Sequence, residues 1–498
     1  MTTSRAGLPV VVDRAAASPL ATQIAEQVRA AVVGGVLSAG ERLPSTRDLA
    51  VMLGVSRTVV TTAYVQLFAE GWLEGRHGSG TYVADVAPGL PPASGAVSKP
   101  PISNNIFIPN GGADCPRTET EYAGEYPAPT GLIEMRPGIP WAPGIEPAAW
   151  RRAWRAAGAH PPSSWPDPYG VPELRAELAD YLRRSRGLRI TPAHVLVTRG
   201  VASGLALLAP ALVRPGEAAG IEDPGYPSAR EVLRRAGAQV VPCRVDAHGV
   251  VPGELPDDLR LLYTTPAHQY PLGGRLPVAR RQALIGWARA TGALVVEDDY
   301  DSEFRYDVGP LPALYSMGPD VIVYLGTTSK MLAPVFGAGW LVAAPDLVER
   351  LAGLRMSVEG RVPEAVQFAL LALLASGDLE RHVRRMRLEY ARRRSALVDA
   401  LTGLTGLTGL GAAAAPGTFR LLGDTAGMHV VLELPPSCPA ERLVRAAADR
   451  GVALWTLDRY YHGATARNGI ILGYGATPLT KVRRAAAELR ALLTAQIS

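Results

Sequence analysis

The sequence is short of lysine, and this shortage limits what its charge can mean. Of 51 basic residues only three are lysines, at positions 99, 330 and 481, and arginine supplies the rest. The net charge is only +5 over 498 residues, which is weak support for a polyanion-binding protein. We attribute the arginine excess to a GC-rich genome and not to function.

Cysteine and long hydrophobic runs are scarce as well. Cys115, Cys243 and Cys438 share no metal-binding or disulfide spacing, so we expect free thiols in a reducing cytoplasm. The first residues lack the pattern of a secretory signal, and no apolar run is long enough to cross a bilayer. These absences exclude a secreted disulfide scaffold and predict a cytoplasmic protein without a membrane partner.

The length predicts more than one domain, because 498 residues exceed one ordinary core. Residues 87–130 are rich in Pro, Gly, Ser and Asn and show no sustained period, which is typical of a linker. We therefore predict a small domain over residues 1–86 and a large domain over residues 131–498.

The small domain has the pattern of a winged helix-turn-helix. Apolar residues recur at helical spacing from Leu20 to Val32, Ser45 with Asp48 resembles a capping box, and Ser56 is expected to cap a third helix. Two short strands, 73–74 and 81–83, flank a glycine-rich turn that would form the wing. The expected inner face of the third helix consists of Val60, Tyr64, Leu67 and Phe68.

In such modules the third helix enters the major groove with its N-terminal end leading. The residues expected to contact DNA are ones that the core does not need: Arg47, Ser56, Arg57, Thr58, Thr61, Thr62, Arg76 and, through its backbone, Gly78. Residues 1–86 hold seven arginines and seven acidic residues, so binding would depend on where the arginines are placed and not on bulk charge. The alternative is a winged-helix module that contacts a protein.

Three segments of this domain resemble the GntR family of bacterial regulators. They are 40–50 (GERLPSTRDLA), 53–57 (LGVSR) and 78–83 (GSGTYV). The resemblance implies double-stranded operator DNA as a partner and DNA contacts from Arg47, Arg57 and Gly78.

The large domain alternates helical patterns with short β-rich runs, which predicts an α/β fold with a mostly parallel sheet. Pyridoxal phosphate chemistry needs a lysine for a Schiff base, a carboxylate for the pyridine nitrogen and a donor for the ring oxygen. Lys330 alone among the lysines lies at a strand-to-turn junction, and Asp298 ends an apolar run with Tyr300 two residues on. The acidic and aromatic cluster at 297–306 could instead be structural.

The large domain resembles the effector domain of the MocR subfamily of GntR regulators, which is similar to fold-type I aminotransferases. The matching segments are 135–138 (MRPG), 168–170 (PYG), 222–226 (EDPGY), 265–271 (TPAHQYP) and the turn around Lys330. The resemblance implies pyridoxal 5′-phosphate on Lys330, with Asp298 at the ring nitrogen and Tyr300 at the ring oxygen. It also implies Tyr226 near the ring face and His268 and Gln269 lining the pocket.

The resemblance further implies a homodimer in which each DNA-binding domain can lie over the partner's effector domain. The linker is long enough to permit this arrangement.

Three positions depart from the family pattern. Gly337 replaces the phosphate-binding arginine, Val201 and Ala202 replace polar residues of the phosphate turn, and Ile471 replaces the arginine that holds a substrate carboxylate. Each lost arginine contact removes roughly 1.5–3 kcal/mol. Gly200, Thr327 and Ser329 remain, with Arg199 beside them, so we expect a weakened phosphate site.

These observations favour a DNA-binding regulator whose aminotransferase-like domain senses pyridoxal phosphate or a related small molecule. One alternative is a working aminotransferase with an appended DNA-binding module, against which Ile471 argues. The other is a regulator whose altered pocket no longer takes pyridoxal phosphate.

Overall fold

The computed structural model describes residues 10–16, 18–76, 80–86, 131–309, 311–355, 361–402, 407–408, 419–423, 425–463 and 465–497. The expected linker at 87–130 lies outside these residues, as do Gly78 of the wing and Cys115.

Three helices and a hairpin form the N-terminal module, as the sequence predicts. They are α1 (Leu20–Val33), α2 (Thr46–Leu53), α3 (Arg57–Glu70), β1 (Leu73–Arg76) and β2 (Gly80–Val83), with β1 and β2 antiparallel. The Ser45 hydroxyl caps α2 by accepting the Asp48 amide at 3.2 Å. Ser56 occupies the cap position of α3 without a side-chain capping bond.

The prediction is wrong for one core residue of this module. Val60, Tyr64 and Leu67 are buried, but Phe68 is 37% exposed. Ala63, and not Phe68, completes the buried stripe of α3 at helical spacing. Phe68 lies at the edge of that stripe beside Gly75 of the wing.

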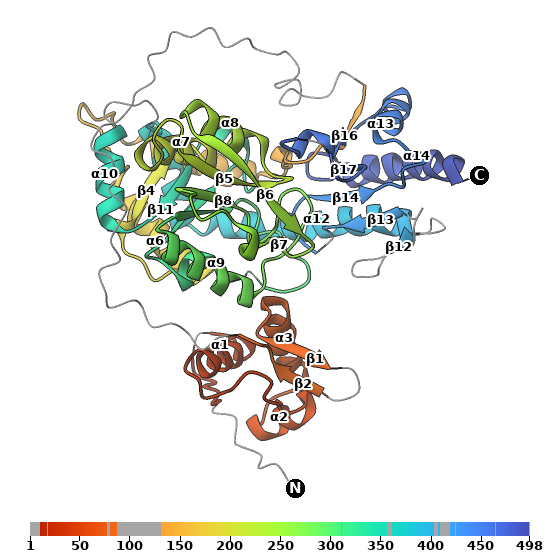
Figure 1. The fold of residues 1–498 in the computed structure, drawn as a ribbon. Coiled ribbons are helices and arrows are strands. Elements are labelled where there is room, and N and C mark those ends of the chain that lie inside the picture. The colour runs from red at the N-terminus through yellow and green to blue at the C-terminus, as the bar shows by residue number, and fades with distance from the viewer. Residues whose placement is uncertain are drawn as a thin grey trace.

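An eight-stranded sheet forms the centre of the large domain, in the order β4-β11-β10-β9-β8-β5-β6-β7 (Figure 1). The neighbours from β10 through β6 are parallel, whereas β11 runs antiparallel to both β10 and β4, and β7 runs antiparallel to β6. The strands are β4 (Val195–Thr198), β5 (Ala218–Asp223), β6 (Gln239–Asp246), β7 (Gly249–Val250), β8 (Leu261–Thr264), β9 (Leu294–Asp299), β10 (Ile322–Thr327) and β11 (Gly339–Val342).

Helices cover both faces of this sheet, because alternate strand residues point to opposite sides. One face packs Leu196, Val296 and Leu325 against α7 (Val201–Leu212), α8 (Pro227–Arg235) and α10 (Pro345–Arg355). The other face packs Val197, Val295 and Tyr324 into a larger core. That core includes side chains of α5 (Pro147–Gly158), α6 (Pro172–Arg186), α9 (Val278–Thr291), α11 (Glu364–Ala375) and α12 (Asp378–Thr402).

A second sheet lies in the C-terminal part of the chain, in the order β12-β13-β14-β17-β16. Its strands are β12 (Leu407–Thr408), β13 (Phe419–Leu422), β14 (His429–Glu433), β16 (Trp455–Thr456) and β17 (Gly469–Gly473). The helices α13 (Ala440–Asp449) and α14 (Leu479–Ile497) accompany it, and Lys481 lies in α14. The first strand of the large domain, β3 (Ile133–Glu134), pairs with β15 (Val452–Ala453), so the beginning of this domain belongs with its end.

The N-terminal module packs against the effector domain of its own chain. Val278 at the start of α9 is 2% exposed within the module's core, and a Cβ added at Gly71 would lie 3.0 Å from Cβ of Pro277. Figure 1 shows α3 as the element of the module nearest to the large domain. Among the described residues, no helix combines the length and apolarity needed to cross a membrane.

Candidate functional site

A pocket opens where parallel strands end, which is the usual ligand position in α/β sheets. Asp298 lies near the end of β9, Lys330 follows β10, and Gly200 precedes α7. The residues lining the pocket are Arg199, Gly200, Val201, Ala202, Ser203, Tyr226, Tyr270, Asp298, Tyr300, Thr327, Ser329 and Lys330. The fold therefore gathers seven of the nine expected cofactor contacts around one cavity, all except His268 and Gln269.

Asp298 is buried and has only one of its two oxygens paired. Tyr263 donates its hydroxyl hydrogen to Oδ2, while Oδ1 is buried without a hydrogen-bond partner. Desolvation raises the pKa of Asp298 to about 8, although the Tyr263 hydroxyl and the nearby Lys330 both lower it. A buried acceptor left in this way fits the protonated nitrogen of a pyridine ring.

Lys330 lies across the same pocket. Its ammonium donates to the carbonyl oxygen of Gly138 at 2.6 Å. Burial lowers the pKa of Lys330, opposed by the charges of Asp298 and Asp301. A lowered pKa increases the neutral fraction of the amine, which is the form that attacks a carbonyl carbon.

His268 contacts the hydroxyl of Tyr300. The Tyr300 hydroxyl lies 2.9 Å from Nδ1 of His268, which also lies 2.9 Å from Oδ2 of Asp301. His268 thus positions Tyr300 and is not itself among the residues that line the pocket. Gln269 lies elsewhere, since its amide donates to Glu222 and to the carbonyl of Pro224.

Most of the acidic and aromatic cluster at 297–306 is structural. Glu297 accepts the amides of Leu314 and Tyr315 at 2.7 and 2.9 Å. Asp299 pairs with the buried Arg186 at 2.5 Å. Because side chains alternate along a strand, only Asp298 of the three consecutive acids lines the pocket.

The other end of the pocket is a small polar cradle. The Thr327 and Ser329 hydroxyls are 2.9 Å apart, and Gly200 faces them with a left-handed φ of 131°. A Cβ at Gly200 would come within 3.4 Å of Thr327 Oγ1 and would fill the cradle. Hydroxyls beside the start of α7 fit a phosphate group.

The positions of the missing arginines are consistent with a weakened site. Gly337 has a left-handed φ of 63°, and a Cβ added there would meet no atom nearer than 3.9 Å, so the position has room for a side chain that glycine does not supply. Ile471 is fully buried in β17, opposite Val431 and Trp455. Together, the ring-contacting half of the pocket fits pyridoxal phosphate well, and the phosphate half fits it with fewer charged contacts.

Sequence reasoning did not identify Tyr270 and Ser203, which line this pocket, or Tyr263, which contacts one of its lining residues. Tyr263 pairs with Asp298 from the adjacent strand β8, and only the sheet order brings them together. Tyr270 lines the pocket, with its ring centroid 5.9 Å from Tyr226 and 5.5 Å from Tyr300. Tyr270 belongs to the segment 265–271, which carries part of the family resemblance, and this was the sequence signal that could have identified it.

The expected DNA contacts lie on the surface of the N-terminal module. Ser56, Arg57, Thr58 and Thr61 are exposed at the leading end of α3, and Arg47 is exposed on α2. Arg57 Nε donates to the Thr46 hydroxyl at 3.3 Å. Arg76 of the wing pairs with Glu74 at 2.9 Å and stacks over the Tyr82 ring.

Two known protein families match this chain, one over the N-terminal module and one over the large domain. Residues 20–83 match the bacterial regulatory proteins of the gntR family, and residues 144–465 match aminotransferase class I and II. These matches define a DNA-binding transcription regulator with an aminotransferase-like domain. The chain belongs to the MocR subfamily of GntR-type regulators.

Two relatives span nearly the whole chain. The HTH-type pyridoxine biosynthesis transcriptional regulator PdxR of Corynebacterium glutamicum is 37% identical over 97% of this chain and 98% of its own length. The probable rhizopine catabolism regulatory protein MocR of Rhizobium meliloti is 33% identical over 98% of this chain and 96% of its own. An archaeal alanine:glyoxylate aminotransferase shares the fold, with a TM-score of 0.66 and 24% identity over 72% of this chain and 90% of its own.

Proposed function

We propose that this regulator senses pyridoxal 5′-phosphate in the pocket between Asp298 and Lys330, and that occupancy of the pocket alters operator binding. The observation that carries the proposal is the buried Asp298 oxygen without a partner, which faces the same cavity as a lysine of lowered pKa. Such a pair is costly to maintain without a ligand that satisfies it.

Each residue would have a distinct task. When bound, pyridoxal phosphate supplies an aldehyde that a lysine amine can attack. Lys330 provides that amine, Asp298 holds a proton on the ring nitrogen, and Tyr300 donates to the ring oxygen. Tyr226 covers the ring, and Gly200, Thr327 and Ser329 bind the phosphate.

The chemistry of the pocket favours the cofactor itself as the signal. An amino acid effector would need a cation for its carboxylate, and the apolar Ile471 occupies the position where aminotransferases place that arginine. The name of the relative from Corynebacterium glutamicum, a regulator of pyridoxine biosynthesis, agrees with a pyridoxal-type ligand. We therefore propose a regulator without efficient aminotransferase activity.

The proposed DNA contacts are Arg47, Ser56, Arg57, Thr58, Thr61, Arg76 and Gly78. We also propose that the regulator acts as a homodimer in the cytoplasm, in line with the family resemblance. The described surface offers isolated exposed apolar side chains, such as Trp165 and Val335, that a second copy could cover. Light scattering of the purified protein tests the dimer.

The experiment that tests the sensor is a titration with pyridoxal phosphate, followed by absorbance and by operator binding. Wild type should gain the yellow band of a lysine-bound cofactor and change its operator affinity in the same concentration range. Lys330→Ala should show neither effect. No band in the wild type at millimolar cofactor would rule out this ligand, and a band that persists in Lys330→Ala would mean another attachment site.

A further inference from the structure

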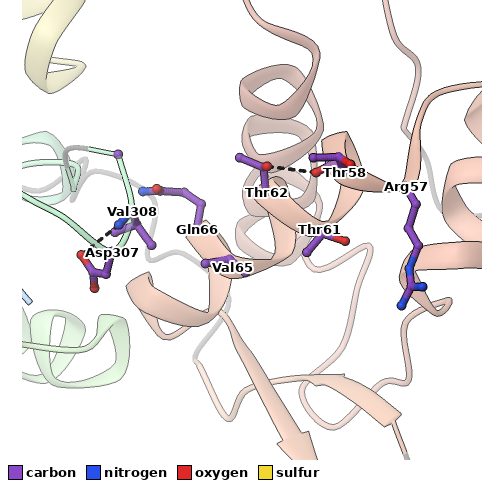
Figure 2. A pocket seen from close by; sticks show the side chains of 9 residues that line it. Arg57, Thr58, Thr61, Thr62, Val65, Gln66, Asp307 and Val308 are labelled. Atoms are coloured by element: carbon purple, nitrogen blue, oxygen red, sulfur yellow. Dashed lines mark hydrogen bonds between the residues drawn. The ribbon is translucent and has the colours of Figure 1, made fainter.

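The turn Asp307–Gly309 of the effector domain lies beside the exposed face of α3. This face, called the DNA-reading face below, consists of Thr58, Thr61, Thr62 and Val65. Together with Arg57, Gln66 and the turn it lines a cavity of about 320 Å³ between the two domains. Figure 2 shows Gln66 and Val65 pointing toward Val308, while Arg57 lies at the far end of the helix.

The turn restricts the space beside the C-terminal half of α3. A helix in the major groove lies between two phosphate strands, in a groove only about 12 Å wide. At the C-terminal half of α3, a Cβ on Gly309 would come within 3.3 Å of the Gln66 side-chain oxygen. The turn therefore leaves little room for a phosphate strand on this side of α3.

The same turn is connected to the cofactor pocket. The chain runs without a break from Asp298 and Tyr300, which line the pocket, to Gly309. Midway, the buried Arg305 donates to the carbonyl of Ala267 at 3.1 Å and to Asp307 at 3.1 Å.

Ala267 precedes His268, whose ring contacts both Tyr300 and Asp301. A movement of Tyr300 can therefore reach Asp307 through the contacts of His268, Ala267 and Arg305. Arg275 ties Asp307 to the domain from the other side, at 2.8 Å.

We propose that the turn Asp307–Gly309 is an autoinhibitory stop for α3, and that the segment 298–309 transmits pocket occupancy to it. While the module is docked, the contact between this turn and α3 prevents the helix from entering the major groove fully. The proposal rests on the proposed function for the identity of the ligand alone, because the stop would act on DNA binding even without one.

The first test loosens the docking without changing the pocket or the DNA-reading face. Val278→Asp places a charge in the apolar contact between the module and α9. We expect operator affinity of the full chain to rise about tenfold, or about 1.4 kcal/mol. The affinities with and without pyridoxal phosphate should become equal. The control is Leu388→Asp, which adds the same charge at an exposed position on α12 and should behave as wild type.

A second variant keeps the proposal testable if Val278→Asp fails to fold. Val308→Ala shortens the side chain that faces Val65 and Gln66 (Figure 2) and leaves Asp307 paired with Arg275 and Arg305, so operator affinity should rise about threefold, the scale of a partly buried methyl contact. Unchanged or weaker operator binding in both variants would overturn the stop.

A distance measurement tests the opening directly. Spin labels at Val51→Cys and Ala290→Cys, both exposed, would report the separation of the module from α9 in a Cys115→Ser background. The distance should increase when operator DNA is added. An identical distance in the operator-bound protein would overturn the proposal.

The absorbance of the same samples separates the two hypotheses. If the cofactor band forms in the wild type and operator affinity changes equally in wild type and Val278→Asp, the coupling fails and the sensor stands. If no band forms while Val278→Asp still tightens DNA binding, the sensor fails and the stop stands.

Discussion

Tyr263 donates its hydroxyl hydrogen to Asp298 from the neighbouring parallel strand, and both side chains are buried. The tyrosine stabilises the charged form of a carboxyl group that burial otherwise keeps neutral. In this way a residue of the neighbouring strand limits the rise in pKa of the residue proposed to bind the ring nitrogen.

Removing this donor should weaken cofactor binding. Tyr263→Phe leaves the ring in place but removes a hydrogen bond that favours the charged form of Asp298, the form that would pair with a protonated ring nitrogen. A hydrogen bond to a charged group is worth about 1.5–3 kcal/mol. We expect the pKa of Asp298 to rise further and pyridoxal phosphate to bind at least tenfold more weakly in a titration at neutral pH. Tyr315→Phe, at a buried tyrosine that does not line the pocket, is the control.

The raised pKa of Asp298 also predicts a pH dependence of stability. The folded carboxyl has a pKa of about 8 against an ordinary value of 3.8, so the folded state binds the extra proton between these limits. This contribution to stability is complete below pH 4 and is lost as pH rises toward 8 and above.

Asp298→Asn lacks this titration. The ligand-free variant should therefore lose less melting temperature than wild type between pH 6 and pH 9, as measured by calorimetry. Equal losses in the two proteins would show that Asp298 is already charged at neutral pH.

An arginine at position 337 should strengthen the phosphate site. Gly337→Arg offers a charge-assisted contact, and pyridoxal phosphate should bind about tenfold more tightly. The left-handed backbone at this position should cost about 1–2 kcal/mol in unfolding free energy. Gly337→Ala carries the same backbone cost without the charge, so only the arginine variant should gain affinity.

Arg57→Ala should weaken operator binding by about 1–3 kcal/mol, because Arg57 is exposed at the leading end of α3. A gel shift at several salt concentrations measures the loss, and wild-type binding should fall steeply as salt rises. Arg183→Ala, an exposed arginine on α6, should leave binding intact. Unchanged affinity in Arg57→Ala would remove this residue from the DNA contacts.

Turnover of common amino acids with 2-oxo acids should be absent or very slow, because the buried Ile471 offers no anchor for a carboxylate. A coupled multiple-turnover assay with purified protein tests this expectation. Robust turnover would support the enzyme alternative.

Local patterns predicted many of the elements of this protein. The helices and hairpin of the N-terminal module follow from apolar periodicity, caps and glycines, and five strands of the large sheet follow from short β-rich runs. The rarity of lysine directed attention to Lys330, and the strand end identified Asp298. Strands β6, β7 and β11 of this sheet were not predicted, and β11 joins the sheet in the antiparallel sense.

Side-chain partners were decided only by the tertiary structure. The sequence places three acids together at 297–299, but the pleat of β9 sends Asp298 to the pocket and its neighbours to Leu314 and Arg186. Tyr263 and Gly138 are distant in sequence from the residues they bind. Likewise, the approach of Gly309 to α3 depends on how two separately folded domains dock. Periodicity encodes which face of an element is buried, whereas the neighbour on that face is set by the order of strands and the packing of domains.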